Sequence, residues 1–207
     1  DDRRDALVGP FQTLEDLPSG ARVGTASVRR RALLLHHRPD LDIGLLRGNV
    51  NTRIAALQDG QFDAIILAVA GLRRLGLDVD YAPLDLAVMS PSAGQGALAI
   101  QTRDRDDPRS LAVMAASADL GCAKTTTEVT AERALLGRLD GSCHTPIAAS
   151  ATCDENGRLH LDGMILSEDG RQAFRDRIDG FGSDATQLGE ALADQLLGAA
   201  GGRHFLA

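Results

Sequence analysis

The chain has 207 residues, enough for one large domain or two ordinary ones. Its hydrophobic content of 43% and charged content of 25% are typical of a globular protein. The net charge of −7 argues against nucleic-acid or anionic-membrane binding, because such partners favour a basic surface. The longest apolar run, AIILAVAGL, is too short to cross a bilayer.

Three cysteines, Cys122, Cys143 and Cys153, have no regular spacing and form no C-x-x-C pair. They predict neither a disulfide framework nor a metal site, and they favour a reducing, cytoplasmic location. Adjacent His36 and His37 do not change this, since neighbouring helical residues point in different directions and cannot easily share one ion.

Residues 1–90 alternate strand and helix signals. Strands are predicted at 21–26 and 42–48 and in the continuous apolar run at 62–71. Helices are predicted over 27–38 and 51–60, the second with Asn51 or Thr52 as N-cap and Gly60 just past its end. This β-α-β-α-β order indicates parallel strands with right-handed crossovers.

The pattern changes in the second half of the chain. A linker-like stretch rich in Pro, Gly and Ser occupies 89–108 and contains one further predicted strand at 97–102. A helix is predicted over 124–139, with Ala131, Leu135 and Leu139 on its buried face. Strands at 146–153, 159–166 and 172–179, with DENG and EDG turns between them, and a last helix over 184–199 predict a small antiparallel sheet flanked by helices.

Arginines are concentrated in one short window of this acidic chain. Residues 22–53 contain only two acids, Asp40 and Asp42, so the window carries +5. Its seven arginines are Arg22, Arg29, Arg30, Arg31, Arg38, Arg47 and Arg53.

Four of these arginines fall where ligands bind in open parallel sheets. Arg29 and Arg30 open the helix after the first predicted strand, while Arg47 and Arg53 follow the second. Arginine is unfavourable at the positive end of a helix dipole, which suggests an anionic ligand. Because no phosphate-binding glycine motif is present, carboxylates are favoured over a nucleotide.

Other charged or reactive residues have simpler interpretations. Arg73 and Arg74 are typical of a solvated pair, and Asp63 of a cap or turn residue at the start of a strand. Taken alone, Cys143 in a Gly-Ser-Cys loop is more typical of a small buried hydrophobe than of a reactive group.

Several motifs together resemble the porphobilinogen deaminase (hydroxymethylbilane synthase) family. They are VGTASVRRR, LLRGNVNTRIAALQDG, PSAGQGALAIQTR and TAERALLGRLDGSCHTPIA, and they run in the family's order through nearly all of the chain. The resemblance implies a cytoplasmic transferase of tetrapyrrole (haem and porphyrin) biosynthesis. Such enzymes join four porphobilinogen molecules into hydroxymethylbilane with release of ammonia, and act as monomers when full length.

The resemblance also assigns roles to individual residues. Cys143 in DGSCHTPIA matches the family's cysteine that carries a dipyrromethane cofactor through a thioether. Each pyrrole of that cofactor and of the linear intermediates bears an acetate and a propionate. By similarity, these carboxylates are bound by Arg29, Arg30, Arg47 and Arg53, with Thr25 and Ser27 as further donors. Arg31 lies one residue beyond the family's pair and is predicted to be solvated.

The family has three domains, and the resemblance divides this chain among them. It implies a doubly wound α/β domain like those of periplasmic binding proteins at 1–94, a returning piece of the mostly missing first domain at 95–118, and a small α/β C-terminal domain with a three-stranded antiparallel sheet at 119–207. Gly94 and Gly96 are interpreted as a hinge or crossover. The predicted strand at 97–102 is expected to lack neighbours and to expose apolar side chains.

The family's catalytic aspartate lies in the missing part, so no catalytic residue is predicted in this chain and the chain alone is expected to be inactive. Two alternatives remain. One is a non-catalytic carboxylate-binding module, for which Cys143 has no role; the other is a piece that works with a separately encoded first domain.

Overall fold

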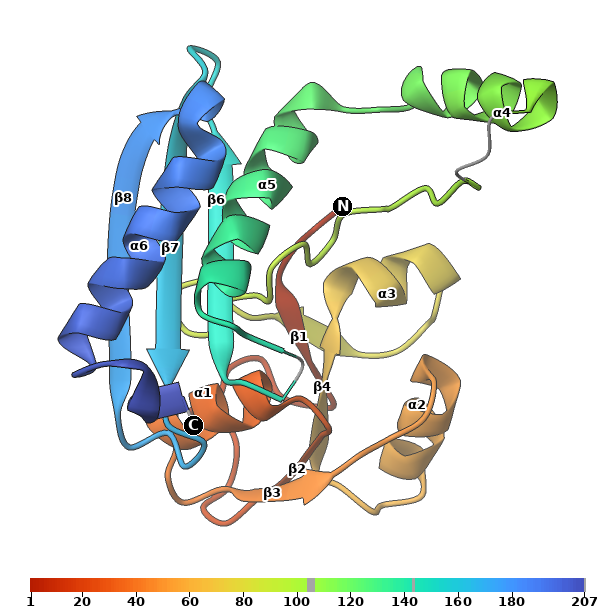
Figure 1. The fold of residues 1–207 in the computed structure, drawn as a ribbon. Coiled ribbons are helices and arrows are strands. Elements are labelled where there is room, and N and C mark those ends of the chain that lie inside the picture. Colours follow the sequence, from red (N-terminus) through yellow and green to blue (C-terminus); the bar gives the residue numbers. More distant parts are fainter. Residues whose placement is uncertain (104–106, 143, 207) are drawn as a thin grey trace.

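The computed structural model describes residues 1–103, 107–142 and 144–206 (Figure 1). Its helices and strands form an α/β fold with one five-stranded sheet and one three-stranded antiparallel sheet. The α/β class and the small antiparallel sheet were both predicted from the sequence. No helix in the described ranges combines the length and the apolar character that a bilayer span requires.

The larger sheet has the strand order β3-β2-β4-β1-β5. Strands β2, β3 and β4 run parallel, as predicted. Strand β1 runs antiparallel to both of its neighbours, β4 and β5, so the sheet is mixed, and neither β1 nor β5 was predicted. The strand bounds are β1 Asp5–Val8, β2 Arg22–Thr25, β3 Asp42–Leu45, β4 Ala64–Ala68 and β5 Tyr81–Pro83.

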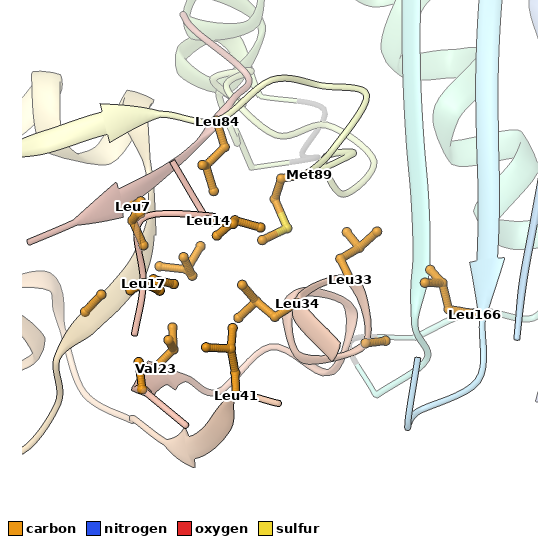
Figure 2. Packing of buried hydrophobic residues seen from close by; sticks show 14 of the residues in the cluster. Leu7, Leu14, Leu17, Val23, Leu33, Leu34, Leu41, Leu84, Met89 and Leu166 are labelled. Carbon is orange, nitrogen blue, oxygen red and sulfur yellow. The ribbon is translucent and has the colours of Figure 1, made fainter. Parts of the chain in front are cut away.

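Helices cover both faces of this sheet, which explains the continuous apolar run of β4. Successive strand residues point to opposite faces. Ala64 and Ile66 therefore join the cluster around helix α1 (Val28–His37), part of which Figure 2 shows. Ile65 and Leu67 join the cluster that contains helices α2 (Val50–Gln58) and α3 (Val69–Leu75).

The start of α2 corrects a detail of the sequence prediction. The N-cap is Asn49, whose side-chain oxygen accepts a hydrogen bond from the Thr52 amide at 2.9 Å, and the predicted caps Asn51 and Thr52 lie inside the helix. A side-chain acceptor two residues earlier satisfies a free amide of the first turn, so the helix begins there. Gly60 follows the helix end with φ of +73°, as predicted.

The smaller sheet contains β6 (Ile147–Cys153), β7 (Arg158–Leu166) and β8 (Ala173–Phe181) in sequence order. Helices α5 (Ala123–Arg138) and α6 (Ala185–Ala199) pack against one of its faces, and short 3₁₀ turns occupy Gly182–Asp184 and Arg203–Leu206 (Figure 1). The predicted apolar face of the first helix is confirmed, since Ala131, Leu135 and Leu139 are buried.

The two sheets share part of one core through α1. Ala148, Met164 and Leu166 of the smaller sheet belong to the same cluster as Leu33 and Leu34 of α1, and Figure 2 shows Leu166 near that helix. The β7–β8 hairpin also touches α1 through the Gly170 carbonyl, 2.9 Å from Nδ1 of His36. The small sheet therefore packs against and supports α1, the helix whose first turn contains Arg29 and Arg30.

The segment before α5 differs most from the prediction. Residues 97–102 form no strand, because no neighbouring strand in the described part of the chain offers them backbone partners. The expected exposure of apolar side chains is confirmed, with Leu98 72% and Ile100 57% exposed. The following helix α4 (Pro108–Ala118) was not predicted, contains no buried residue, and stands apart from the other helices in Figure 1.

Candidate functional site

The turn between β2 and α1 is built by two hydroxyl side chains. Oγ1 of Thr25 accepts a hydrogen bond from the Ser27 amide at 3.2 Å, and Ser27 caps α1 by accepting one from the Arg30 amide at 3.4 Å. These contacts fix the first turn of the helix. Arg29 and Arg30 are therefore held at the carboxyl end of β2, as predicted.

A buried carboxylate that the sequence analysis missed lies between these two arginines. Asp5, in β1, has no exposed surface. Its Oδ2 accepts from Nη2 of Arg29 at 2.9 Å, and its Oδ1 accepts from Nε and Nη2 of Arg30 at 3.1 and 2.7 Å. Burial alone raises the pKa of Asp5, but the charges and hydrogen bonds of the two arginines outweigh it, and the pKa is lowered.

This contact corrects the argument from the helix dipole. Negative charge does offset the cost of two arginines at the start of α1, but at least part of this charge comes from the protein's own Asp5 and not from a ligand. No local signal distinguishes this aspartate, which opens a four-residue strand 24 positions before Arg29.

Arg29 is enclosed almost completely, with 4% of its surface exposed. Besides Asp5, it donates to the Ser90 carbonyl and to Oε1 of Gln95, the latter at 3.3 Å. Its Nε is the one buried side-chain polar atom without a hydrogen-bond partner among the described residues. Burial lowers the pKa of Arg29, yet Asp5 keeps the guanidinium in an ion pair.

Arg47 and Arg53 lie near the carboxyl end of the neighbouring parallel strand β3, where Arg47 is exposed and Arg53 is half-buried. Nε of Arg53 donates to the Gly48 carbonyl at 2.9 Å, and its terminal nitrogens have no acceptor among the described residues. Burial, and then the nearby charge of Arg30, lower the pKa of Arg53. Arg47 is exposed and forms no ion pair with any acid in the described ranges.

Together these residues form a candidate anion site with unbalanced charge. Four arginines surround the ends of β2 and β3, and among the described residues one acid, Asp5, pairs with two of them. The site can therefore bind a ligand with several carboxylates, first through Arg47 and Arg53.

The other described residues that the sequence analysis singled out lie outside this cluster. Arg31 is exposed on α1, as expected. Asp63 accepts the Arg22 amide at 2.7 Å, in keeping with a turn residue. Arg73 and Arg74 are exposed and pair with Asp2 and Asp1. Cys143, the predicted attachment point, lies outside the described residues.

The loop at 94–96 is a close crossover, in line with its interpretation from the sequence. Gly94 and Gly96 have φ of +73° and +88°. A Cβ on Gly96 would lie 3.0 Å from the Asp1 carbonyl oxygen, so only glycine lets the two segments pass. Between them, Nε2 of Gln95 donates to the Arg3 carbonyl at 2.7 Å and to Oδ1 of Asp5 at 2.9 Å.

A second buried cluster joins this loop to helix α5. Glu128 accepts from Nη2 of Arg3 at 3.0 Å and from the Cys153 amide at 2.9 Å. Glu132 accepts from the Gly94 amide at 2.7 Å and the Ala151 amide at 2.8 Å. Both glutamates are buried, and neither was singled out from the sequence.

Glu132 should make the stability of the fold depend on pH. Burial raises its pKa, so the folded state binds its proton more tightly than the unfolded state. Its stabilising contribution is complete below the unfolded pKa of about 4.3 and is lost as pH rises through the higher folded value. We expect urea unfolding at about pH 4 and about pH 7 to show wild type losing stability relative to Glu132→Gln as pH rises. A gap that stays constant or moves the other way would contradict this.

Comparison with known protein families gives two matches that follow the chain. Residues 1–110 match the family model described as porphobilinogen deaminase, dipyromethane cofactor binding domain. Residues 126–198 match the model described as porphobilinogen deaminase, C-terminal domain. The first range contains all four arginines and Asp5.

Curated relatives carry the same name. Proteins named porphobilinogen deaminase from Trichlorobacter lovleyi and Pelobacter propionicus are each 48% identical over 207 residues, which is 100% of this chain and 64% and 65% of theirs. One from Brevibacillus brevis is 44% identical over 95% of this chain and 62% of its own length. The chain thus spans less than two thirds of the length of these relatives.

Proposed function

The chain belongs to the porphobilinogen deaminase family, and from this premise we propose that it is the cofactor-holding part of a tetrapyrrole-forming transferase. The proposed reaction of the whole enzyme joins four porphobilinogen molecules into linear hydroxymethylbilane, with one ammonia released at each addition. We further propose that the whole enzyme is a cytoplasmic monomer whose ligands are porphobilinogen and linear pyrroles. We also propose that the chain divides into three parts. These are a unit like a periplasmic binding protein at 1–94, a segment that returns to the family's first domain at 95–118, and a C-terminal unit at 119–207.

The observation that carries this proposal is the unbalanced charge of the anion site. Asp5 is the only acid paired with any of the four arginines in the described part of the chain, although the whole chain carries −7. Positive charge concentrated in this way is costly unless a polyanion is bound. A dipyrromethane, with an acetate and a propionate on each pyrrole, has the charge that the site needs.

The donor set fits such a group. Arg30, Arg47 and Arg53 would bind its carboxylates, and the unpartnered Nε of buried Arg29 adds a donor that lacks an acceptor. Thr25 and Ser27 remain part of the proposed site, because a hydroxyl that accepts an amide hydrogen bond still has its own proton to donate. Cys143 would hold the group through a thioether, and the bound group would supply the attachment point for the growing chain.

The chain on its own is expected not to turn over porphobilinogen. Loss of ammonia places positive charge on the pyrrole, and a nearby free carboxylate is needed to stabilise it. Asp5 is buried and already accepts four hydrogen bonds. Measured ammonia release from the 207-residue chain should therefore not exceed that of a Cys143→Ser control. Steady release above that control would contradict this expectation.

The proposal is tested most directly at Cys143. The protein is isolated from its native source, and the peptide that contains Cys143 is analysed by mass spectrometry. We expect the mass of a dipyrromethane adduct on this peptide, with Cys122 and Cys153 unmodified. An unmodified Cys143 peptide would favour a non-catalytic carboxylate-binding module in place of the enzyme.

A further inference from the structure

The buried carboxylate of Asp5 is arranged to orient the guanidinium of Arg30. Nε and Nη2, which form one edge of that guanidinium, both donate to the same oxygen, Oδ1, at 3.1 and 2.7 Å. Nη1 makes only a long contact of 3.3 Å to the Ile66 carbonyl. One edge of Arg30 is therefore fixed from inside the protein, while Arg30 retains about 9% exposure.

Asp5 is itself held in place by Gln95. The amide of Gln95 donates to Oδ1 of Asp5 and to the Arg3 carbonyl, and its oxygen accepts from Nη2 of Arg29 and from Oγ of Ser92, each at 3.3 Å. All of these contacts use one amide orientation, so Gln95 cannot turn without breaking several of them. It lies between the two positive-φ glycines of the crossover loop.

We propose that Asp5, held by Gln95, is a positioning residue of the anion site, which orients the Arg30 guanidinium toward the ligand carboxylates. This inference rests on the proposed function, because it takes the ligand to be a pyrrole that bears carboxylates. Asp5 itself has no exposed surface, so it would act on the ligand only through Arg30. Orienting a flexible arginine before binding lowers the entropy lost when the ligand binds.

The effect of replacing Asp5 on ligand binding distinguishes positioning from simple electrostatics, because the two predict opposite changes in affinity. Asp5 places a negative charge beside an anion site, so its removal by Asp5→Asn should strengthen anion binding if the carboxylate acts only through its charge. If Asp5 positions Arg30, the same substitution weakens binding, because asparagine has one acceptor oxygen where the carboxylate has two, and its amide group turns donors toward one of the two arginines that Asp5 holds.

The experiment compares wild type, Asp5→Asn and the matched control Asp40→Asn. Asp40 pairs with Arg38 at the other end of α1, at the same 2.7 Å distance as Asp5 and Arg30, but lies outside the site. Porphobilinogen is titrated into each purified chain by calorimetry. We expect binding to Asp5→Asn to be weaker by about tenfold and binding to Asp40→Asn to be unchanged. Tighter or equal binding by Asp5→Asn would overturn the proposal.

Two further measurements keep the test decisive. If Asp5→Asn does not fold, Gln95→Ala, which leaves the net charge unchanged, should still weaken binding several-fold, and unchanged affinity would overturn the proposal.

The Nε–H signal of Arg30 is also followed by nitrogen-15 NMR without ligand. It should be protected from solvent exchange in wild type and in Asp40→Asn and lose protection in Asp5→Asn, and equal protection in all three would overturn the proposal. If the NMR result holds while wild type does not bind porphobilinogen, the proposed function fails and the positioning of Arg30 stands.

Discussion

Replacement of Arg29 with methionine is expected to lower the free energy of unfolding by about 3–5 kcal/mol, a large part of the 5–15 kcal/mol of a typical domain. Arg29 is 4% exposed and donates to Asp5, Gln95 and the Ser90 carbonyl. Methionine fills similar space but leaves Asp5 buried with one ionic partner fewer. The cost therefore comes mainly from the buried carboxylate that remains, whose charge Arg30 alone then compensates.

Arg47→Met is the matched control for this effect. Arg47 is exposed and has no ionic partner in the described ranges, so its replacement should change the free energy of unfolding by no more than about 0.5 kcal/mol. The same variant should weaken porphobilinogen binding, because Arg47 is an open cation of the proposed site. Urea unfolding followed by circular dichroism measures both variants. Equal stability of the two would mean that Asp5 needs only Arg30.

Arg29 and Arg30 are buried and paired with Asp5, whereas Arg47 and Arg53 have no acidic partner among the described residues. The sequence cannot predict this difference. The placement of the four arginines at the ends of two adjacent parallel strands follows from local strand and helix signals, and the structure confirms it. Their burial does not follow, because it depends on a carboxylate in β1, a short strand inserted next to β4 without any distinctive pattern. The sequence therefore predicts where the four arginines gather but cannot show which of them are already paired.

The same reasoning explains the predictions that succeeded and failed elsewhere. The hairpins of the small sheet carry their own turn residues, and Gly157 and Gly170 have φ of +76° and +71° as such turns require. Residues 97–102 have an equally apolar pattern, yet they form no strand. A strand needs partners for its backbone groups, and these come from tertiary structure rather than from local sequence.

Gly189, in the middle of α6, should not tolerate even alanine. A Cβ at this position would lie 2.4 Å from the carbonyl oxygen of Ala131 and 2.8 Å from the amide nitrogen of Leu135, both in the backbone of α5. Backbone atoms cannot rotate away as a flexible side chain can, so the two helices would have to separate. We expect Gly189→Ala to lower the free energy of unfolding by about 1–3 kcal/mol.

Gly198 provides an internal control in the same helix, since a Cβ there would meet no atom within 4 Å. Alanine at this position keeps the helix and reduces the freedom of the unfolded chain, so Gly198→Ala should raise the free energy of unfolding by about 0.5–1 kcal/mol. The same chemical change should thus have opposite signs nine residues apart, as measured by urea unfolding. If both variants gain stability, α5 and α6 do not pack at the close distance described. Since that pair supports the small sheet, and the small sheet contacts α1, the position of the arginine pair depends on this packing.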